Sequence, residues 1–230
     1  GTSMRSYPSL GGSFNTDIGY SYLLRGAQDS YFKSIIRANL KAQTSIVVNE
    51  LDPNLTLYPL SFLGFGLGKK MLNSNYDEFT YYDCDEVRCR GKLDKAYQFA
   101  KLALGYGPII STFNYIQSDN NYTMEDENNY PVAEYNYVLA VNPREETQID
   151  RKYFIGFKLD EHSIFGLSSF RTEFLKSDKL FEMNLGVYSK KIKNMNLLFG
   201  VGTIHSSDVE SGGVIVFQFK HQILPSLALF

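Results

Sequence analysis

Residues 31–48, YFKSIIRANLKAQTSIVV, alternate between apolar and polar side chains in a way that restricts the folds open to this chain. The clearest members of the two phases are Phe32, Ile36 and Leu40 against Lys33, Arg37 and Lys41. A spacing of four suits a helix as well as a strand, but the period of two holds throughout, with only Ile35 and Val47 out of phase. A helix would spread the polar residues around its sides without a clean stripe. The window is therefore predicted to be a β-strand with two chemically different faces.

The same alternation recurs along most of the chain, and short turn signals such as ELDPN, NPREET and LDEHS separate the runs. Connections this short favour antiparallel pairing, because parallel strands need long crossovers. The predicted strands are 13–26, 31–48, 55–72, 93–117, 130–142, 148–160, 163–176, 179–191, 195–206 and 212–224. The sequence therefore predicts an all-β, antiparallel fold of about ten strands, within a range of eight to twelve.

The segment 93–117 is the least defined of these elements. It fits one long strand, two strands broken at Gly105–Pro108, or a short helix followed by a strand. Splitting it, with the tail LPSLALF as a further strand, would give twelve. Residues 1–12 begin with GTSM, which is typical of an expression-tag remnant, and form a lead-in. Residues 13–230 are expected to form one domain with polar loops near 73–92 and 118–130.

Charge and hydropathy exclude two classes of protein. The net charge is −2, from 23 basic and 25 acidic residues, so the chain lacks the basic excess that nucleic-acid binding requires. No apolar run reaches the roughly 18–20 residues of a membrane-spanning helix. The best candidate, residues 57–67, is short and is followed by Lys69 and Lys70.

The length of the alternating runs favours a membrane protein. Strands of soluble proteins commonly have about 5–6 residues, whereas crossing a bilayer takes about 9–11 tilted residues. A Lys or Arg on the lipid face near the midplane costs about 2–4 kcal/mol, so Lys33, Arg37 and Lys41 are expected to point inward. We therefore predict an antiparallel transmembrane β-barrel whose apolar face meets lipid.

The lumen of a barrel with about ten strands is expected to be narrow, because side chains nearly fill it. The residues predicted to line this lumen are Asp17, Arg25, Lys33, Arg37, Lys41, Asp150, Lys152, Lys158, Arg171, Glu173, Glu182 and Lys190. Charges of both signs would pair there. The barrel is expected to be a monomer.

Cys84 and Cys89 lie in an acidic, tyrosine-rich stretch that reads as a turn. A disulfide closing so small a loop is typical of an oxidising compartment, and two unrelated free thiols are the alternative. Two thiols without a nearby histidine fall short of a tetrahedral zinc site, and the acidic loops lack the ligand spacing of a calcium loop. No metal and no cofactor are expected.

The alternating spans, the polar acidic loops and the C-terminal VIVFQFKHQILPSLALF resemble a Gram-negative outer-membrane β-barrel protein. Chains of that class commonly end in a strand closed by Phe, which the barrel-assembly machinery reads. The resemblance thus implies an assembly signal at Phe230 and a location in the outer membrane, with outer-membrane lipids and the assembly machinery as partners. Pro225 departs from the pattern, because proline interrupts a strand ladder.

The leading expected function is that of a narrow channel for small solutes, or else a structural or surface-binding role in the cell envelope. A lipid hydrolase is one alternative, because His205 and Ser207 share a strand face and Glu210 follows. This is similar to the His-x-Ser motif of outer-membrane lipid A deacylases and phospholipases, in which a base activates a serine. The stretch HSSDVESGG (205–213) is equally typical of a polar hairpin loop, because Ser, Asp and Gly favour turns. The other alternative is a soluble β-barrel that binds an apolar ligand.

The motif GFGLGKK (64–70) carries three glycines and two lysines but lacks the spacing of a phosphate-binding loop. Its glycines are expected instead to let the strand bend or interior side chains fit.

Overall fold

A computed structural model gives the fold. It describes residues 2–5, 11–26, 32–45, 48–74, 84, 86–87, 89–123, 131–134, 139–141, 145–208 and 211–221.

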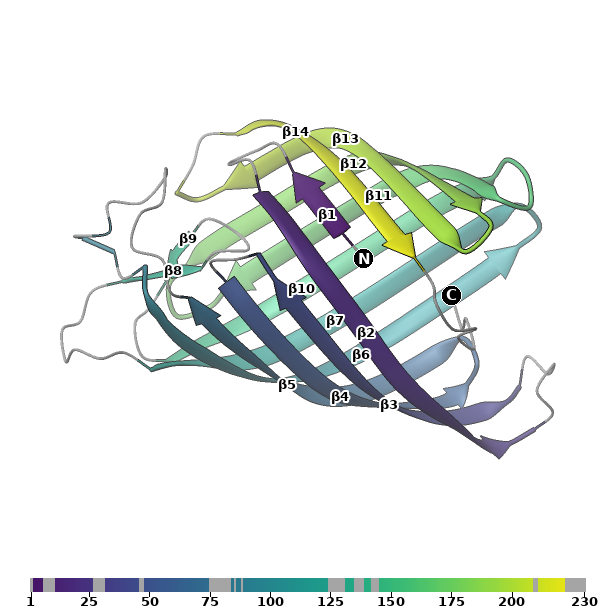
Figure 1. Cartoon of the computed structure of the whole chain (residues 1–230), viewed down its shortest axis with the longest axis horizontal. Coiled ribbons are helices and arrows are strands. Elements are labelled where there is room, and N and C mark those ends of the chain that lie inside the picture. The colour runs from purple at the N-terminus through teal and green to yellow at the C-terminus, as the bar shows by residue number, and fades with distance from the viewer. Residues whose placement is uncertain are drawn as a thin grey trace.

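Eleven long strands form one antiparallel sheet that curves strongly (Figure 1). They are β2 (Gly11–Arg25), β3 (Ser34–Thr44), β4 (Val48–Leu60), β5 (Leu63–Ser74), β6 (Gly91–Tyr106), β7 (Ile109–Thr123), β10 (Glu145–Lys158), β11 (Ser163–Phe174), β12 (Lys179–Ile192), β13 (Met195–Ser206) and β14 (Gly212–His221). Each pairs with its neighbours in this order. Between β7 and β10, the short strands β8 (Val132–Glu134) and β9 (Leu139–Val141) form a separate two-stranded sheet. The prediction of an all-β, antiparallel fold is confirmed.

The two edges of this sheet are joined only through a short strand at the start of the chain. β1 (Thr2–Arg5) pairs with β2 on one side and with β14 on the other. Within the described residues, β2 and β14 do not pair directly, so the eleven long strands do not close on themselves by hydrogen bonds. The sequence prediction had treated these four residues as an irregular lead-in.

The predicted boundaries differ most in the first half of the chain. One strand was expected over 31–48 and another over 55–72, with a turn at ELDPN, but β4 runs through that turn signal and the chain reverses at Ser61–Phe62 instead. Pro53 lies inside β4, opposite Leu40 of β3, and the ladder between β4 and β5 is interrupted at Asp52 and Pro53. The segment 93–117 is two strands, β6 and β7, separated at Gly107–Pro108, and the predicted strand 130–142 is replaced by β8 and β9.

The connections divide the sheet into a turn end and a loop end. The turn end carries the reversals at 61–62, 107–108, 159–162 and 193–194, and the loop end carries 45–47, 75–90, 124–144, 175–178 and 207–211. In the turn at 159–162, the Asp160 carboxylate accepts a hydrogen bond from the backbone N–H of His162 at 2.6 Å. This bond holds the pKa of the exposed Asp160 carboxyl below its usual range. β8 and β9 lie at the loop end, on the left in Figure 1.

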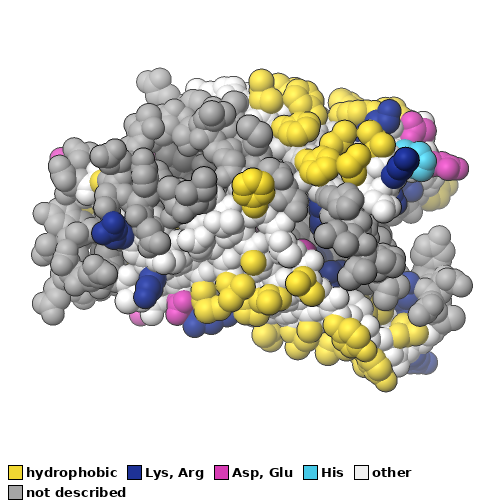
Figure 2. Space-filling model, in the orientation of Figure 1, with side chains coloured by type: hydrophobic (Ala, Val, Ile, Leu, Met, Phe, Trp, Pro, Cys, Tyr) yellow, Lys and Arg dark blue, Asp and Glu magenta, His cyan; other side chains and the backbone are white. Residues whose placement is uncertain are grey.

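The convex, outer face of the sheet carries a continuous apolar band. Directly opposed pairs such as Ile18 with Leu40, and Ile155 with Leu167, place its members on one face. One member from each long strand is Ile18, Leu40, Leu55, Phe65, Leu104, Ile109, Ile155, Leu167, Tyr188, Phe199 and Ile215, all between 37% and 68% exposed. Figure 2 shows hydrophobic side chains gathered along the outside of the strands. Towards the loop end the same face turns polar, for example at Lys69 of β5 and Arg151 of β10.

The concave, inner face has two halves of different chemistry. On β11–β14 it is apolar, with Phe181, Leu185, Ile204 and Val214 all below 8% exposed. On β3–β7 and β10 it is largely polar and includes buried charged residues such as Asp150. The outer face is therefore apolar and the β3–β7 and β10 part of the inner face is polar, the reverse of a soluble β-protein, whereas the β11–β14 part of the inner face is apolar.

Three glycines of β5 make room for aromatic rings on the inner face. A Cβ at Gly64 would lie 2.6 Å from the Tyr58 ring, one at Gly66 2.3 Å from the Phe99 ring, and one at Gly68 2.5 Å from the Tyr97 ring. The rings of β4 and β6 thus lie flat across β5, so the glycines of GFGLGKK let interior side chains fit.

We predict that Gly66→Ala lowers the free energy of unfolding by about 1–3 kcal/mol, because its Cβ also meets the Leu55 carbonyl oxygen at 2.4 Å. Gly105→Ala, whose Cβ meets nothing closer than 3.8 Å, is the matched control and should change stability by less than about 0.5 kcal/mol. Equilibrium unfolding in urea measures both. Equal effects of the two substitutions would contradict the ring packing.

Candidate functional site

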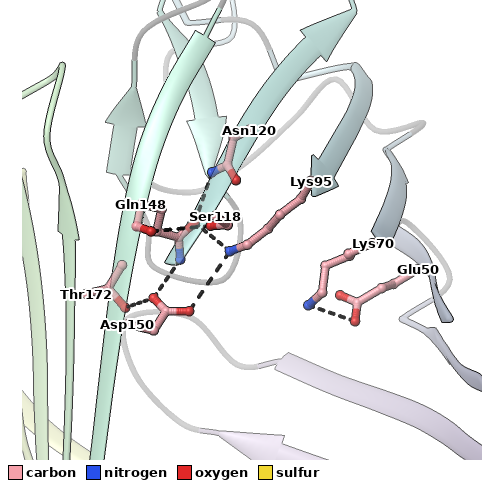
Figure 3. Close-up of polar contacts among 8 residues, drawn as sticks. All are labelled: Glu50, Lys70, Lys95, Ser118, Asn120, Gln148, Asp150 and Thr172. Carbon is pink, nitrogen blue, oxygen red and sulfur yellow. Dashed lines mark hydrogen bonds and ion pairs between the residues drawn. The ribbon is translucent and has the colours of Figure 1, made fainter. Parts of the chain in front are cut away.

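A buried polar network joins β6, β7, β10 and β11 on the inner face (Figure 3). Lys95 Nζ donates to Gln148 Oε1 at 2.7 Å and lies 4.0 Å from Asp150 Oδ2. Asp150 Oδ1 accepts hydrogen bonds from Gln148 Nε2 and Thr172 Oγ1, both at 2.7 Å. Asn120 Nδ2 donates to the same Gln148 oxygen at 2.9 Å. These groups are at most 7% exposed, so the charges of Lys95 and Asp150 are compensated without bulk water.

The remaining inner carboxylates are also engaged. Glu50 pairs with Lys70 at 2.9 Å, and Asp52 accepts a hydrogen bond from the Tyr97 hydroxyl. Asp17 lies 3.9 Å from the Arg37 guanidinium. Each inner carboxylate on β2, β4 and β10 therefore has a donor in contact.

A group of lysines on the same face is different, and we call Lys41, Lys101 and Lys152 the basic cluster. Lys101 of β6 and Lys152 of β10 stand directly opposite Asn114 of β7 from its two sides. Lys101 lies within electrostatic range of Lys41, Arg37 and Lys152, although β3 and β10 are far apart in the strand order. The curvature of the sheet therefore brings like charges to face one another.

The basic cluster has no carboxylate in direct contact, although Asp52 lies within electrostatic range of Lys101, and Asp150 and Glu50 within that of Lys152. Lys41 and Lys152 are exposed although they project from the inner face, and Lys101 is half-buried. Within the described residues, no carboxylate lies within 4.0 Å of any of the three ammonium groups. Lys101 and Lys152 instead lie over the rings of Phe99 and Phe170, at 4.3 and 4.7 Å.

An apolar layer crosses the inner space near the loop end. One residue from each of β5, β6, β7, β9, β11, β12, β13 and β14 contributes to it: Leu72, Leu93, Tyr122, Val141, Phe174, Phe181, Ile204 and Val214. Val141 of β9 is 1% exposed. Beside it, the Ala140 N–H donates to Asp208 Oδ2 at 2.8 Å, and Lys179 pairs with Asp208. β8 and β9 are thus held against the inner face by the packing of Val141 and by the hydrogen bond from Ala140 to Asp208, a carboxylate that Lys179 pairs with.

The structure places half of the predicted lumen residues on the inner face. These are Asp17, Arg37, Lys41, Asp150, Lys152 and Lys158. Arg25 and Lys33 lie at the two ends of the β2–β3 connection, where a register shift between Leu23 and Arg25 interrupts the alternation. Sequence reasoning missed Lys95, Gln148 and Lys101, because the strand order that places β7 between β6 and β10 is not visible in a single run.

Four predicted lumen residues lie on the outer face instead: Arg171, Glu173, Glu182 and Lys190. Arg171 stands opposite both Arg151 and Glu182, and Glu173 Oε1 accepts hydrogen bonds from Arg151 and Arg171 at 2.8 Å each. The prediction assumed that every apolar stripe faces outward. On β11 and β12 the inner face is apolar, so the charged side chains lie outside, three of them beyond the apolar band towards the loop end.

The structure does not bring His205 and Ser207 together. His205 Nδ1 lies 2.7 Å from Ser211 Oγ, whereas Ser207 Oγ accepts the Leu180 N–H at 2.8 Å and contacts its carbonyl at 3.2 Å. Both residues lie at the loop end of β13, on the outer face. Glu210, the predicted acid, lies outside the described residues.

The predicted disulfide between Cys84 and Cys89 is present, and Cys89 is buried. Phe230 lies outside the described residues, as do Pro225 and most of the predicted loops 73–92 and 118–130. Among the residues that are described, no group of three His, Cys, Asp or Glu side chains is placed to hold a metal ion. The described residues also contain no helix that is long and apolar enough to cross a membrane.

Comparison with known proteins gives no relative for this chain: no protein-family model, no curated protein and no solved structure matches it.

We predict that Lys95→Met lowers the free energy of unfolding by about 3 kcal/mol, because it leaves the buried Asp150 charge without its cation. Lys69→Met is the matched control. Lys69 pairs with Asp94 at 3.1 Å but both side chains are about half exposed, so its loss should cost less than about 1 kcal/mol. Urea unfolding of both variants measures the difference, and similar costs would contradict a buried network.

Proposed function

We propose that this protein is an integral β-barrel of the Gram-negative outer membrane, in which β1 completes the ring between β2 and β14. The observation that carries this proposal is the reversed distribution of side chains, with an exposed apolar band outside and buried charges inside. An apolar band around all eleven long strands is unfavourable in water and favourable in hydrocarbon. Strands of ten to sixteen residues also match or exceed the length that a bilayer requires.

The proposed orientation follows from the connections, because outer-membrane barrels have short periplasmic turns and longer extracellular loops. The connections at 61–62, 107–108 and 193–194 are the shortest, and the longest, 75–90 and 124–144, belong to the loop end. The loop end would therefore face the outside of the cell and the turn end the periplasm. Glu173 pairs with Arg151 and Arg171 on the loop side of the apolar band, where a charge can reach water. A disulfide near the loop end is consistent with an oxidising envelope. Outer-membrane lipids would cover the band, and the barrel-assembly machinery would insert the chain.

Within this membrane barrel, we propose passage of small solutes along the inner face. The water-accessible lysines on β3 and β10 supply a polar route through part of the interior. The apolar layer at the loop end is the narrowest obstacle, because residues from eight strands meet there. Passage would require the β8–β9 hairpin to withdraw Val141 from that layer.

We predict that Ile155→Arg destabilises the protein in lipid bilayers by about 2–4 kcal/mol, because Ile155 is 54% exposed at the centre of the band. Ala96→Arg is the control, since Ala96 is exposed on the outer face of β6 beyond the band. Urea unfolding in vesicles and the gel mobility of unheated against heated samples report both. A cost below about 0.5 kcal/mol for Ile155→Arg, in a protein that stays monodisperse without detergent, would indicate a soluble β-barrel instead.

We predict that replacing residues 131–141 by a Gly/Ser linker increases the fraction of time that the protein conducts in planar bilayers. The expected reason is loss of Val141 from the apolar layer. Asp208→Asn, which weakens the anchor of Ala140 and Lys179, should act in the same direction but less strongly. If neither the natural protein nor the linker variant passes current at any voltage, solute passage is wrong even when the barrel inserts.

A further inference from the structure

We propose that the basic cluster of Lys41, Lys101 and Lys152 is a binding site for a small solute that carries two or more negative charges. This names the solute class for the proposed passage and rests on that function in one respect, namely that solutes reach the inner face from water. Lys101 and Lys152 lie between the Asp150 network and the turn ends of β6 and β10, and Lys41 lies in the loop-side half of β3.

The first support is the unequal distribution of partners among the inner charges. Asp17, Glu50, Asp52 and Asp150 each contact a donor from the chain itself. The three ammonium groups of the basic cluster have no carboxylate within 4.0 Å among the described residues. The local excess is therefore positive, although the whole chain carries a net charge of −2.

The second support is geometric convergence. Lys101, Asn114 and Lys152 form one row across three adjacent strands, in which neighbouring Cα atoms are about 4.5–5.5 Å apart. Lys41 of β3 lies within electrostatic range of both other lysines. The three cations repel each other, and a multivalent anion bound among them reduces that repulsion.

The third support is what holds the lysines in place. Phe99 lies under Lys101, and its ring is fixed across Gly66 of β5. Phe170 lies under Lys152. An ammonium group held over an aromatic face loses less side-chain entropy when it binds an anion than a freely rotating one.

Pyrophosphate is a suitable probe, because it carries more than two negative charges at neutral pH. Isothermal titration of the detergent-folded protein should show saturable binding that weakens as the salt concentration rises. Binding should fall at least tenfold in the variant that combines Lys101→Gln with Lys152→Gln. Lys190→Gln, on the outer face of β12, is the matched control and should leave the affinity within twofold of the natural protein.

The single variants Lys101→Gln and Lys152→Gln provide the test if the double variant fails to fold, and each should weaken binding at least threefold. Unchanged affinity in the folded single variants, or equal loss in Lys190→Gln, overturns the site. Titration does not depend on bilayer current. Binding of pyrophosphate without bilayer current would support the site and contradict solute passage. Bilayer current together with unchanged affinity in the lysine variants would support passage and contradict the site.

Discussion

Charged side chains on the inner face must each find either a partner or water, and the interior is arranged around that requirement. Lys95 and Asp150 meet the requirement by contact, through Gln148 and Thr172, in a region closed to solvent. The basic cluster meets it by water access and aromatic faces. The part of the inner face formed by β11–β14 carries apolar side chains, so the requirement does not arise there. The inner face thus combines a buried polar network, a water-accessible group of lysines and an apolar region.

Alternation in the sequence was sufficient to identify two faces on every strand, and this is why the all-β fold was predictable. It was not sufficient to fix boundaries where a turn signal is carried inside a strand, as at Pro53 of β4. The same rule failed for Arg171, Glu173, Glu182 and Lys190, because both faces of β11 and β12 carry apolar residues. The position of each residue along the barrel axis decides which of them belong to the outer band. That position depends on the register between paired strands, which a single strand does not contain.

The buried network shows the same limit for the site. Asp150 was identified from its strand alone, whereas Lys95 belongs to a segment whose strand structure was ambiguous, and Gln148 is an uncharged residue at the first position of the predicted strand 148–160. Their association depends on β7, which separates β6 from β10 and brings their inner residues within reach. In the proposed barrel, the residues that matter most for the interior are thus those whose neighbours are distant in sequence.

The glycine positions of β5 couple two properties of the inner face. Because β5 has no side chains of its own at 64, 66 and 68, the rings of Tyr58, Phe99 and Tyr97 occupy that level. The Tyr97 hydroxyl also donates to Asp52, and Phe99 lies under Lys101. In the proposed barrel, exchanging either of these two rings would therefore change the free cross-section and the placement of an inner charge together.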